Sequence, residues 1–409
     1  MWYCMPACFE SVLKNKIKIN EVFGFIVEVL LRIQIIFATS TSKNSQKHSN
    51  LIVFTISWER SLIVSPLLSM SKLTLEEVAK LSGVSRSTVS RVINDHPNVK
   101  PEVRERVWQV VNETGYHPDP AARSLAGYRS GIIGLVIPHA VQMLFTDPYI
   151  PRLLQGITQA CNALDYTLSL FVLHTPAEEE KLYRRILQTQ LYDGIIVQAA
   201  PVGDPLIKQL VEHAVPFVMI GRPDDESKIS FVNVDNVVGA YTAVSHLIRL
   251  GCQRIATITG PSNTTVGLDR RQGYLNALND RSRTIIPELI VEGDFTETGG
   301  YLAMQRLLPH KPDAVFAASD TMAYGALRAL RLGHLSVPDD VAVVGFDDLI
   351  TSATSDPPLT TIRQPILRVG RQAVEILIDI IANGLEPSHR IIMPTELVIR
   401  ASCGAEKAD

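Results

Sequence analysis

The chain has 409 residues, enough for two or three domains, and a formal net charge of −3. A charge this close to balance excludes a protein that coats nucleic acid nonspecifically, so any DNA binding has to come from a local patch. The five cysteines show no metal-ligand spacing, although Cys4 and Cys8 could pass for half a site. We expect reduced thiols in a cytosolic protein, with no metal or cofactor.

The first 69 residues differ from the rest in being rich in Ile, Phe, Lys, Ser and Asn. Residues 22–38 are mostly apolar but include Glu28 and Arg32, and an isolated charge at the centre of a membrane helix costs ~2.5–3.5 kcal/mol. Met70 directly precedes the first clear helix, so our hypothesis is that translation starts there and that 1–69 is a non-native extension. A membrane tether and a disordered tail are the alternatives. A signal peptide is a weak interpretation because no small-residue cleavage site follows.

Residues 70–117 are expected to form three short helices. Thr74 and Glu77 have the spacing of a capping box, and Ser85 is placed to cap the second helix. Gly83 stands between the first two helices, where a left-handed backbone lets the chain turn. The third helix is expected over 101–114. Apolar residues at helical spacing supply the expected core: Val78, Ala79, Leu81, Val89, Val92, Ile93, Val103, Val107 and Val110.

The outer face of the second helix is polar and basic. It carries Arg86, Ser87, Thr88, Ser90 and Arg91, whose side chains can donate to phosphate oxygens and guanine edges. Two short helices joined by a tight turn, the second of them polar, indicate a helix-turn-helix that reads DNA. The alternative is an ordinary helical hairpin in which both arginines are simply solvated.

From residue 132 onward, short apolar runs alternate with amphipathic helices. The expected strands are 132–137, 167–173, 194–197, 217–220, 255–259, 314–318 and 341–345, with further strands near 360–365 and 397–400. Such runs are typical of parallel strands that helices cover on both faces. They fall into two sets, so we predict an α/β core of two doubly wound parallel-sheet lobes behind the all-α helix-turn-helix domain.

The core carries no motif of a common enzyme class: no glycine-rich dinucleotide loop, phosphate loop, nucleophile elbow or zinc-protease motif. Asp347 and Asp348 could suggest a carboxylate pair, but adjacent residues at a strand end point in opposite directions. We therefore expect no catalytic site. Two parallel lobes place their strand ends across a cleft, and the polar residues at those ends suit the hydroxyl groups of a small ligand.

Two motifs carry a specific resemblance to a known family. The stretch from Val78 to Asn94 resembles "VAxxxGVSxxTVSRVxN", and the stretch from Gly115 to Leu135 resembles "GYxPxxxARSLxxxxSxxIGL". Both are typical of the lactose-repressor (LacI/GalR) family of bacterial transcriptional regulators, and the resemblance covers about 72–402. It implies a ligand-responsive repressor of carbohydrate-use genes. Such a protein binds a pseudo-palindromic DNA operator as a homodimer, in the cytoplasm at the nucleoid, and has no membrane partner.

The resemblance also implies which residues contact DNA. Arg86, Ser87 and Arg91 would enter the major groove and read bases, and Thr88, Ser90 and Asn94 are better placed for phosphates. The capping residues Thr74 and Ser85 complete the set expected from the three-helix domain.

A hinge helix is implied within 118–130. Its short segment is expected to fold only on the operator and to dock in the minor groove. There Leu125 would wedge between base steps, with Arg123 and Ser124 beside it. The alternative is that Leu125 packs on the core. Ala126 departs from the family, where many members have a basic residue at this position.

In the cleft, the resemblance implies an effector site made of Tyr149, Arg222, Arg270, Asp320 and Asp347. Arg270 would donate to the effector, and Asp347 would accept from it. Alternatives remain open: Arg270 and Asp347 could form a structural ion pair, Asp320 could cap a helix, and Tyr149 could pack at a dimer face. The polarity of the pocket favours a sugar over a purine, which would call for more aromatic stacking.

The expected divisions are the extension 1–69, the helix-turn-helix domain 70–117, the hinge helix and linker 118–130, and an effector-binding and dimerisation core 131–405. Within the core, lobe 1 is expected at about 131–231 and 361–388, and lobe 2 at about 232–360 and 389–405. A competing hypothesis is a sugar-binding protein of the periplasmic type tethered by 1–69. That hypothesis does not explain the helix-turn-helix.

Overall fold

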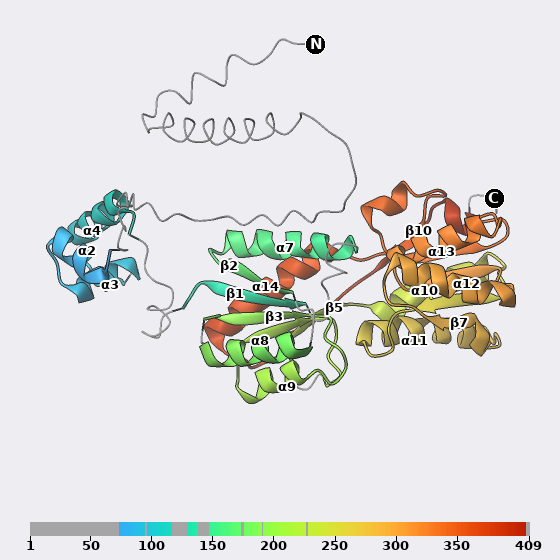
Figure 1. The fold of residues 1–409 in the computed structure, drawn as a ribbon, viewed down its shortest axis with the longest axis horizontal. Coiled ribbons are helices and arrows are strands. Elements are labelled where there is room, and N and C mark those ends of the chain that lie inside the picture. The colour runs from blue at the N-terminus through green and yellow to red at the C-terminus, as the bar shows by residue number, and fades with distance from the viewer. Residues whose placement is uncertain are drawn as a thin grey trace, which may run out of the picture. The chain divides into compact units, whose positions relative to one another are not determined.

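The computed structural model describes residues 73–94, 96–116, 129–137, 147–172, 176–189, 191–225 and 228–405. These residues form a three-helix domain and a core of two α/β lobes (Figure 1), which confirms the predicted fold class. The predicted extension 1–69 and the hinge residues Arg123, Ser124 and Leu125 lie outside the described residues. Within the described ranges, no helix is long and apolar enough to cross a membrane.

The three-helix domain consists of α2 (Leu75–Ser82), α3 (Arg86–Ile93) and α4 (Pro101–Thr114). The predicted capping box is present, because the Thr74 side chain accepts from the Glu77 amide while the Glu77 carboxylate accepts from the Thr74 amide at 2.6 Å. Gly83 adopts the left-handed conformation with φ of 63°, which ends α2 and turns the chain into α3. A cluster of buried side chains joins the three helices: Val78, Ala79, Val89, Val92, Val107, Val111 and Tyr116.

The predicted burial of Leu81 is wrong, because its side chain is 59% exposed. Val78, Ala79 and Ser82 share the inner face of α2, and Leu81 lies to the side of that face. Ser82 is buried, and its hydroxyl group keeps a hydrogen-bond partner because it donates to the Val78 carbonyl at 2.6 Å.

The first lobe contains a six-stranded sheet with the order β11-β5-β4-β3-β1-β2, and all its neighbouring strands are parallel. Its strands are β1 (Ile132–Ile137), β2 (Thr167–Val172), β3 (Gly194–Gln198), β4 (Phe217–Ile220), β5 (Phe231–Val234) and β11 (Arg390–Met393). Its helices are α7 (Tyr149–Ala163), α8 (Pro176–Thr189), α9 (Pro205–Glu212) and α14 (Ile366–Asn383).

Successive residues of the central strands point to opposite faces of this sheet. Leu135 and Ile196 belong to the core cluster that includes residues of α7 and α14, whereas Val136 and Ile195 pack with residues of α8 and α9. Both faces are therefore covered, which explains why the strands read as continuous apolar runs.

The second lobe has a sheet with the order β12-β10-β9-β8-β6-β7, in which β12 is antiparallel to β10 and the other pairs are parallel. Its strands are β6 (Ile255–Thr259), β7 (Ile290–Glu292), β8 (Ala314–Ala317), β9 (Ala342–Asp347), β10 (Thr360–Arg363) and β12 (Glu396–Val398). Its helices are α10 (Asn236–Arg249), α11 (Thr265–Asp280), α12 (Glu297–Leu307) and α13 (Asp320–Leu332). Short 3-10 turns occur at η1 (Pro287–Leu289), η2 (Leu308–His310), η3 (Ile350–Ala353) and η4 (Ala401–Cys403).

The sheets correct the predicted lobe boundaries. Strands β5 and β11 belong to the first sheet, so the first lobe extends past residue 231 and past residue 388. Strand β10 pairs with β9, so residues 361–363 belong to the second lobe. Each of these strands is assigned to the lobe whose sheet it pairs with. The chain crosses to the other lobe only after the strand ends.

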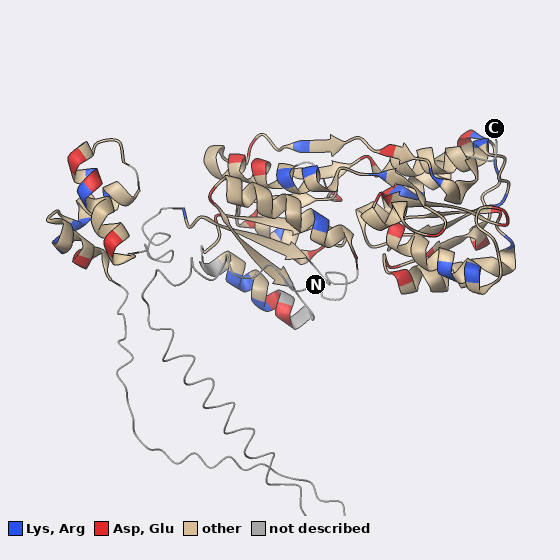
Figure 2. Cartoon of the chain, turned by 90° about the horizontal axis from the view of Figure 1, so that it is seen from above, with Lys and Arg blue, Asp and Glu red and all other residues tan. Residues whose placement is uncertain are grey.

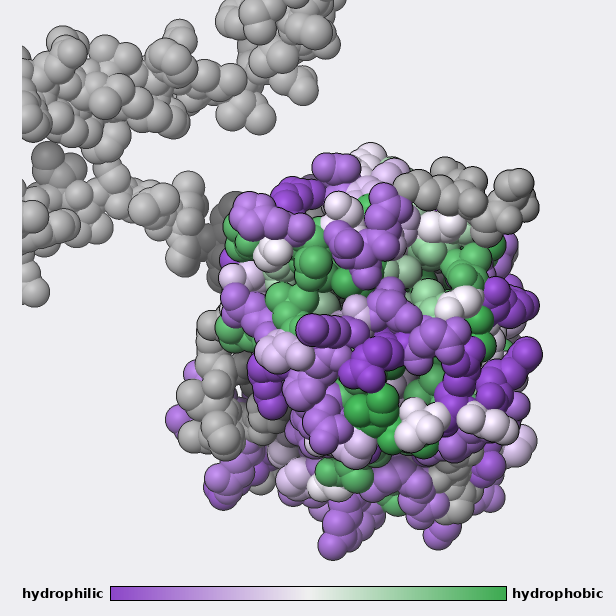
Figure 3. Space-filling view, turned by 90° about the vertical axis from the view of Figure 1, so that its right-hand side faces the viewer, coloured by the Kyte–Doolittle hydropathy of each residue, from purple (hydrophilic) through white to green (hydrophobic). Residues whose placement is uncertain are grey.

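Charge and apolar side chains are spread over the surface of the core. Figure 2 shows acidic and basic residues interspersed on the helices of both lobes. The face drawn in Figure 3 has apolar side chains in small patches among polar ones. The helices of the core thus mix both signs of charge, whereas the small domain presents a polar and basic helix, α3, as the candidate nucleic-acid reader.

Candidate functional site

Helix α3 presents the first candidate site. Arg86, Ser87 and Arg91, predicted to read bases, are all exposed, and Thr88 and Ser90 beside them are half-buried. The buried side chains of the same helix are Val89 and Val92, which anchor it to the domain core. The structure therefore brings the predicted base-reading side chains together on the outer face of one short helix.

Three other residues of the predicted DNA-binding set are engaged in capping. Thr74 completes the capping box of α2, and the hydroxyl oxygen of Ser85 accepts from the Thr88 amide at 3.2 Å. The Asn94 side chain donates to the Ser90 carbonyl at 2.8 Å, and its own amide oxygen is buried. Asn94 thus has a structural role at the end of α3, and its phosphate contact stays a prediction.

Arg86 is paired with Glu76 of α2, with Nη1 and the carboxylate 2.9 Å apart. Both side chains are largely exposed, so the pair contributes little to stability and its members are free to exchange partners. A guanidinium in this position can leave Glu76 for a phosphate or a guanine edge when DNA approaches.

The second candidate site is a cavity of about 380 Å³ between the two lobes. A volume of this size suits a small molecule. Residues of both lobes and of the crossing segments line it; its polar members include Asp147, Tyr149, Gln198, Asn233, Asn236, Asn263, Thr264, Arg270, Asp294, Ser319, Asp347 and Gln364.

Arg270 is held in the wall of this cavity by several acceptors. Its Nε donates to Asn236 at 2.8 Å, and its Nη1 donates to the Ala318 carbonyl at 2.5 Å. The guanidinium also lies 3.6 Å from the centre of the Phe346 ring, a cation–π contact. Burial lowers the pKa of Arg270, and the nearby Asp347 carboxylate opposes that shift.

Asp347 lies at the end of β9 and faces the cavity. It accepts from Gln364 at 2.6 Å and forms an ion pair with Arg270 at 3.5 Å. Burial raises the pKa of Asp347 well above its ordinary value, although Arg270 favours the ionised form. The ion pair between Arg270 and Asp347, which was the alternative to their contact with an effector, is present, and both side chains also lie on the cavity wall.

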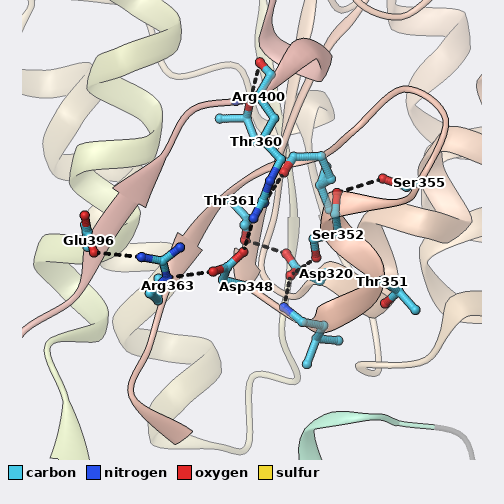
Figure 4. A network of polar contacts seen from close by, with 12 residues as sticks. Asp320, Asp348, Thr351, Ser352, Ser355, Thr360, Thr361, Arg363, Glu396 and Arg400 are labelled. Atoms are coloured by element: carbon cyan, nitrogen blue, oxygen red, sulfur yellow. Dashed lines mark hydrogen bonds and ion pairs between the residues drawn. The ribbon is translucent and has the colours of Figure 1, made fainter.

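Asp348 points the other way, as expected for the neighbour of a strand-end residue. Figure 4 shows its carboxylate between Arg363 and Arg400, at 2.7 and 2.6 Å. Burial alone would raise the pKa of Asp348, but the hydrogen bonds from the two arginines outweigh burial and hold it below the usual value. The two adjacent aspartates therefore contact different groups and do not act as a carboxylate pair.

Asp320 lies behind the cavity wall, which corrects its predicted contact with the effector. Its carboxylate accepts from the Ser352 and Thr361 hydroxyls, both at 2.5 Å, and from the Leu349 amide at 2.9 Å (Figure 4). The N-cap of α13 is its neighbour Ser319, which does line the cavity. Asp320 instead anchors the start of α13 to η3 and β10.

Arg222 does not lie among the cavity-lining residues, although its neighbour Gly221 does, and its contact with the effector stays a prediction. Its guanidinium donates to the Asp269 carboxylate, with Nη2 and Oδ1 2.8 Å apart. Residue 222 follows β4 in the first lobe and residue 269 belongs to α11 in the second, so the pair joins the lobes.

Tyr149 lines the cavity at the start of α7, as predicted. Burial raises the pKa of its phenol, and so does the negative charge of Asp347. Its neighbour Asp147, which we did not predict, accepts from the Tyr149 amide at 3.1 Å and from the Thr321 hydroxyl of the second lobe at 3.2 Å. Burial raises the pKa of Asp147.

Other lining residues that escaped prediction include Asn236, Asp294, Phe295 and Gln364. Asn236 and Gln364 lie where the chain crosses between lobes, and Asp294 and Phe295 follow β7, a strand of 3 residues. A strand so short leaves little periodic signal. What could have identified these residues is their position directly after a strand, at the carboxyl edge of a parallel sheet where ligands bind.

The side chains that line the cavity are suited to binding a small ligand. Amide, hydroxyl and carboxyl groups with one guanidinium can hydrogen-bond the hydroxyl groups of a ligand. Among the described residues, no group of three or more His, Cys, Asp or Glu is placed to hold a metal ion.

Comparison with known proteins identifies both parts of the chain. Residues 74–119 match the family described as bacterial regulatory proteins, lacI family, and residues 244–403 match a periplasmic binding protein-like domain. The chain belongs to the LacI family and is a bacterial DNA-binding transcriptional regulator. This confirms the family and class of function predicted from the sequence.

Two relatives illustrate the likeness over the whole length. The HTH-type transcriptional regulator CelR of Thermobifida fusca is 39% identical over 80% of this chain and 98% of the relative. The HTH-type transcriptional repressor PurR of Edwardsiella ictaluri is 35% identical over 80% of this chain and 96% of the relative.

Two solved structures cover nearly the same length. A complex of CelR with cellobiose has a TM-score of 0.65 at 37% identity, over 81% of this chain and 99% of that one. The Lac repressor dimer bound to operator and the anti-inducer ONPF has a TM-score of 0.70 at 29% identity, again over 81% and 99%.

Proposed function

We propose that the protein is a repressor that binds a pseudo-palindromic operator as a homodimer and changes its affinity for that operator when an uncharged sugar occupies the interlobe cavity. The observation that carries this proposal is the combination, in one chain, of an exposed basic α3 with an interlobe cavity whose lining includes amide, hydroxyl and carboxyl groups. The solved Lac repressor dimer on its operator supports the dimer and the DNA partner.

On the DNA, Arg86, Ser87 and Arg91 enter the major groove. Thr88 and Ser90 contact phosphates, and the hinge residues Arg123, Ser124 and Leu125 dock in the minor groove. A protein with this task acts at the nucleoid in the cytoplasm. We expect no catalytic activity, because a cavity that only has to recognise a ligand needs no nucleophile or general base.

The lining of the cavity favours an uncharged effector. Asp147, Asp294 and Asp347 supply three carboxyl groups, and Arg270 is the one cation among the described lining residues. A phosphate group placed here would lie near these acidic groups and would be repelled by those that are ionised. Hydroxyl groups, which donate and accept, suit the same residues, and the complex of CelR with cellobiose supports a neutral disaccharide.

The proposed coupling between ligand and operator is thermodynamic. A sugar that prefers one arrangement of the lobes shifts the protein toward it and thereby alters the geometry presented to DNA. The periplasmic-type sugar-binding protein, our competing hypothesis, would leave the exposed basic face of α3 without a purpose.

Isothermal titration of the purified protein tests the effector class. We expect cellobiose or another neutral disaccharide to bind at micromolar to millimolar concentration, and glucose 6-phosphate to bind at least tenfold more weakly. Tighter binding of the phosphorylated sugar, or of a purine base, would overturn the neutral-sugar assignment.

A further inference from the structure

Two hydrogen bonds join Arg222 of the first lobe to Asp269 of the second. Nη2 donates to Oδ1 at 2.8 Å, and Nε donates to Oδ2 at 3.3 Å. The Arg222 side chain is 29% exposed and that of Asp269 is 14% exposed. A two-point arginine–carboxylate pair that is partly removed from water is stronger and more directional than a surface pair.

Two neighbouring contacts join the lobes at the same place. The Thr265 hydroxyl at the start of α11 donates to the Arg222 carbonyl at 2.6 Å, and the Val202 amide donates to the Asn263 carbonyl at 2.8 Å. We call these contacts, together with the Arg222–Asp269 pair, the clasp. It connects loops that follow β3 and β4 of the first lobe to the loop and helix that follow β6 of the second.

The clasp differs from ordinary ion pairs of the core. Arg328 and Glu297, for example, pair at 3.2 Å between α13 and α12, so they stay together however the lobes move. The clasp can form only when the two lobes are close, because its members belong to different sheets. Asp269 also immediately precedes Arg270, so the clasp holds the turn of α11 that carries the cavity guanidinium.

We propose that Arg222 and Asp269 are positioning residues that hold the lobes closed around the cavity before an effector arrives, and so set the effector affinity. If the effector binds the closed arrangement, every ligand-free molecule that is open lowers its apparent affinity. The part that concerns effector affinity rests on the proposed function, whereas the closing of the lobes does not.

The Val202 amide gives a ligand-free readout, because its hydrogen-bond acceptor belongs to the other lobe. Hydrogen–deuterium exchange of the intact protein at fixed pH should show this amide exchanging about three- to thirtyfold faster in Asp269→Asn and in Arg222→Gln than in wild type. Amides inside β1 and β6 should keep their protection in the same samples.

Matched variants distinguish loss of the clasp from a general loss of stability. Glu297→Gln removes the carboxylate of the Arg328 pair within one lobe and should leave exchange at Val202 unchanged. The double variant Arg222→Gln with Asp269→Asn should resemble either single variant, because the two residues act as one unit. Cellobiose affinity, measured by titration, should fall by the factor by which the closed population falls.

Two results would overturn the clasp: unchanged exchange at Val202 in both single variants, or faster exchange throughout α11 and β6, which would indicate local unfolding. Failure of the wild type to bind cellobiose would instead count against the proposed effector. The exchange measurement would still decide the clasp in that case.

Discussion

Arg270 brings a positive charge into the interior of the second lobe, where Asn236, Ala318 and Asp347 accept from it. Arg270→Gln would leave the Asp347 carboxyl buried without its cation. We expect this variant to lower the free energy of unfolding by about 3 kcal/mol at pH 7, as measured by urea denaturation.

Adding Asp347→Asn in the same chain should recover part of that loss, because no unpaired buried charge then remains. Equal stability of wild type and Arg270→Gln would show that the pair is dispensable to the fold.

Asp348 provides a pH-dependent test, because its pKa in the folded protein is held below the ordinary value by Arg400 and Arg363. An ionised group of this kind contributes stability that is present above the unfolded pKa and is lost as the pH falls through the folded pKa. We expect Asp348→Asn to cost about 1–3 kcal/mol at pH 7 and progressively less below about pH 4. Chemical denaturation at pH 3, 5 and 7 measures this, and a deficit that grows toward low pH would contradict the assignment.

Individual site residues were predictable where a motif fixed their place in the fold. The positions of Arg270, Asp347 and Tyr149 on the cavity wall agree with prediction. Asp320 and Arg222 also follow strands, but the side chains of both turn to partners that are far away in sequence. No local pattern reveals Thr361 as a partner for Asp320 or Asp269 as a partner for Arg222, because those contacts depend on how the sheets and lobes pack.

At the scale of the element, α3 depends on Ser85 for its start. Ser85→Ala removes the acceptor for the Thr88 amide and should cost about 1 kcal/mol of local stability. We expect faster hydrogen exchange at the Val89 and Val92 amides of the full-length protein. Unchanged exchange at these amides would show that the cap is unimportant.

Ser87→Ala is the matched control, since it makes the same chemical change two residues later in α3. It should alter stability by no more than about 0.5 kcal/mol, yet weaken operator binding by about fivefold or more if Ser87 reads a base. Loss of stability without loss of DNA affinity would contradict the role proposed for Ser87.

Elements with strong periodicity were the predictable ones. The helix expected over 101–114 and the strand expected over 132–137 have the bounds observed for α4 and β1. Strands β5, β7 and β11 were missed. Their length of 3 or 4 residues is not a sufficient reason, since β4 and β8 are as short and were predicted, but Asn233 also interrupts the apolar run of β5. β11 lies at the edge of its sheet, and two of its four residues are exposed, unlike those of a central strand.

At the scale of the whole molecule, the two-lobe architecture was predictable because the alternation of strands and helices occurs twice. The exact lobe boundaries were not, because the crossing strands are assigned by hydrogen bonds between distant segments. The proposed response to a sugar also belongs to this scale. It requires the cavity, the contacts between lobes and the DNA reader to act together, which no single residue accomplishes.

The central claim is tested most directly by fluorescence anisotropy with the purified protein and labelled DNA from upstream of its own gene, at fixed salt because phosphate contacts make the affinity salt-dependent. Affinity is measured alone and with cellobiose or other neutral sugars at saturating concentration. We expect tight, sequence-specific binding that one of these sugars changes by about tenfold or more. Absence of specific binding, or specific binding that no sugar alters, would contradict a sugar-responsive repressor.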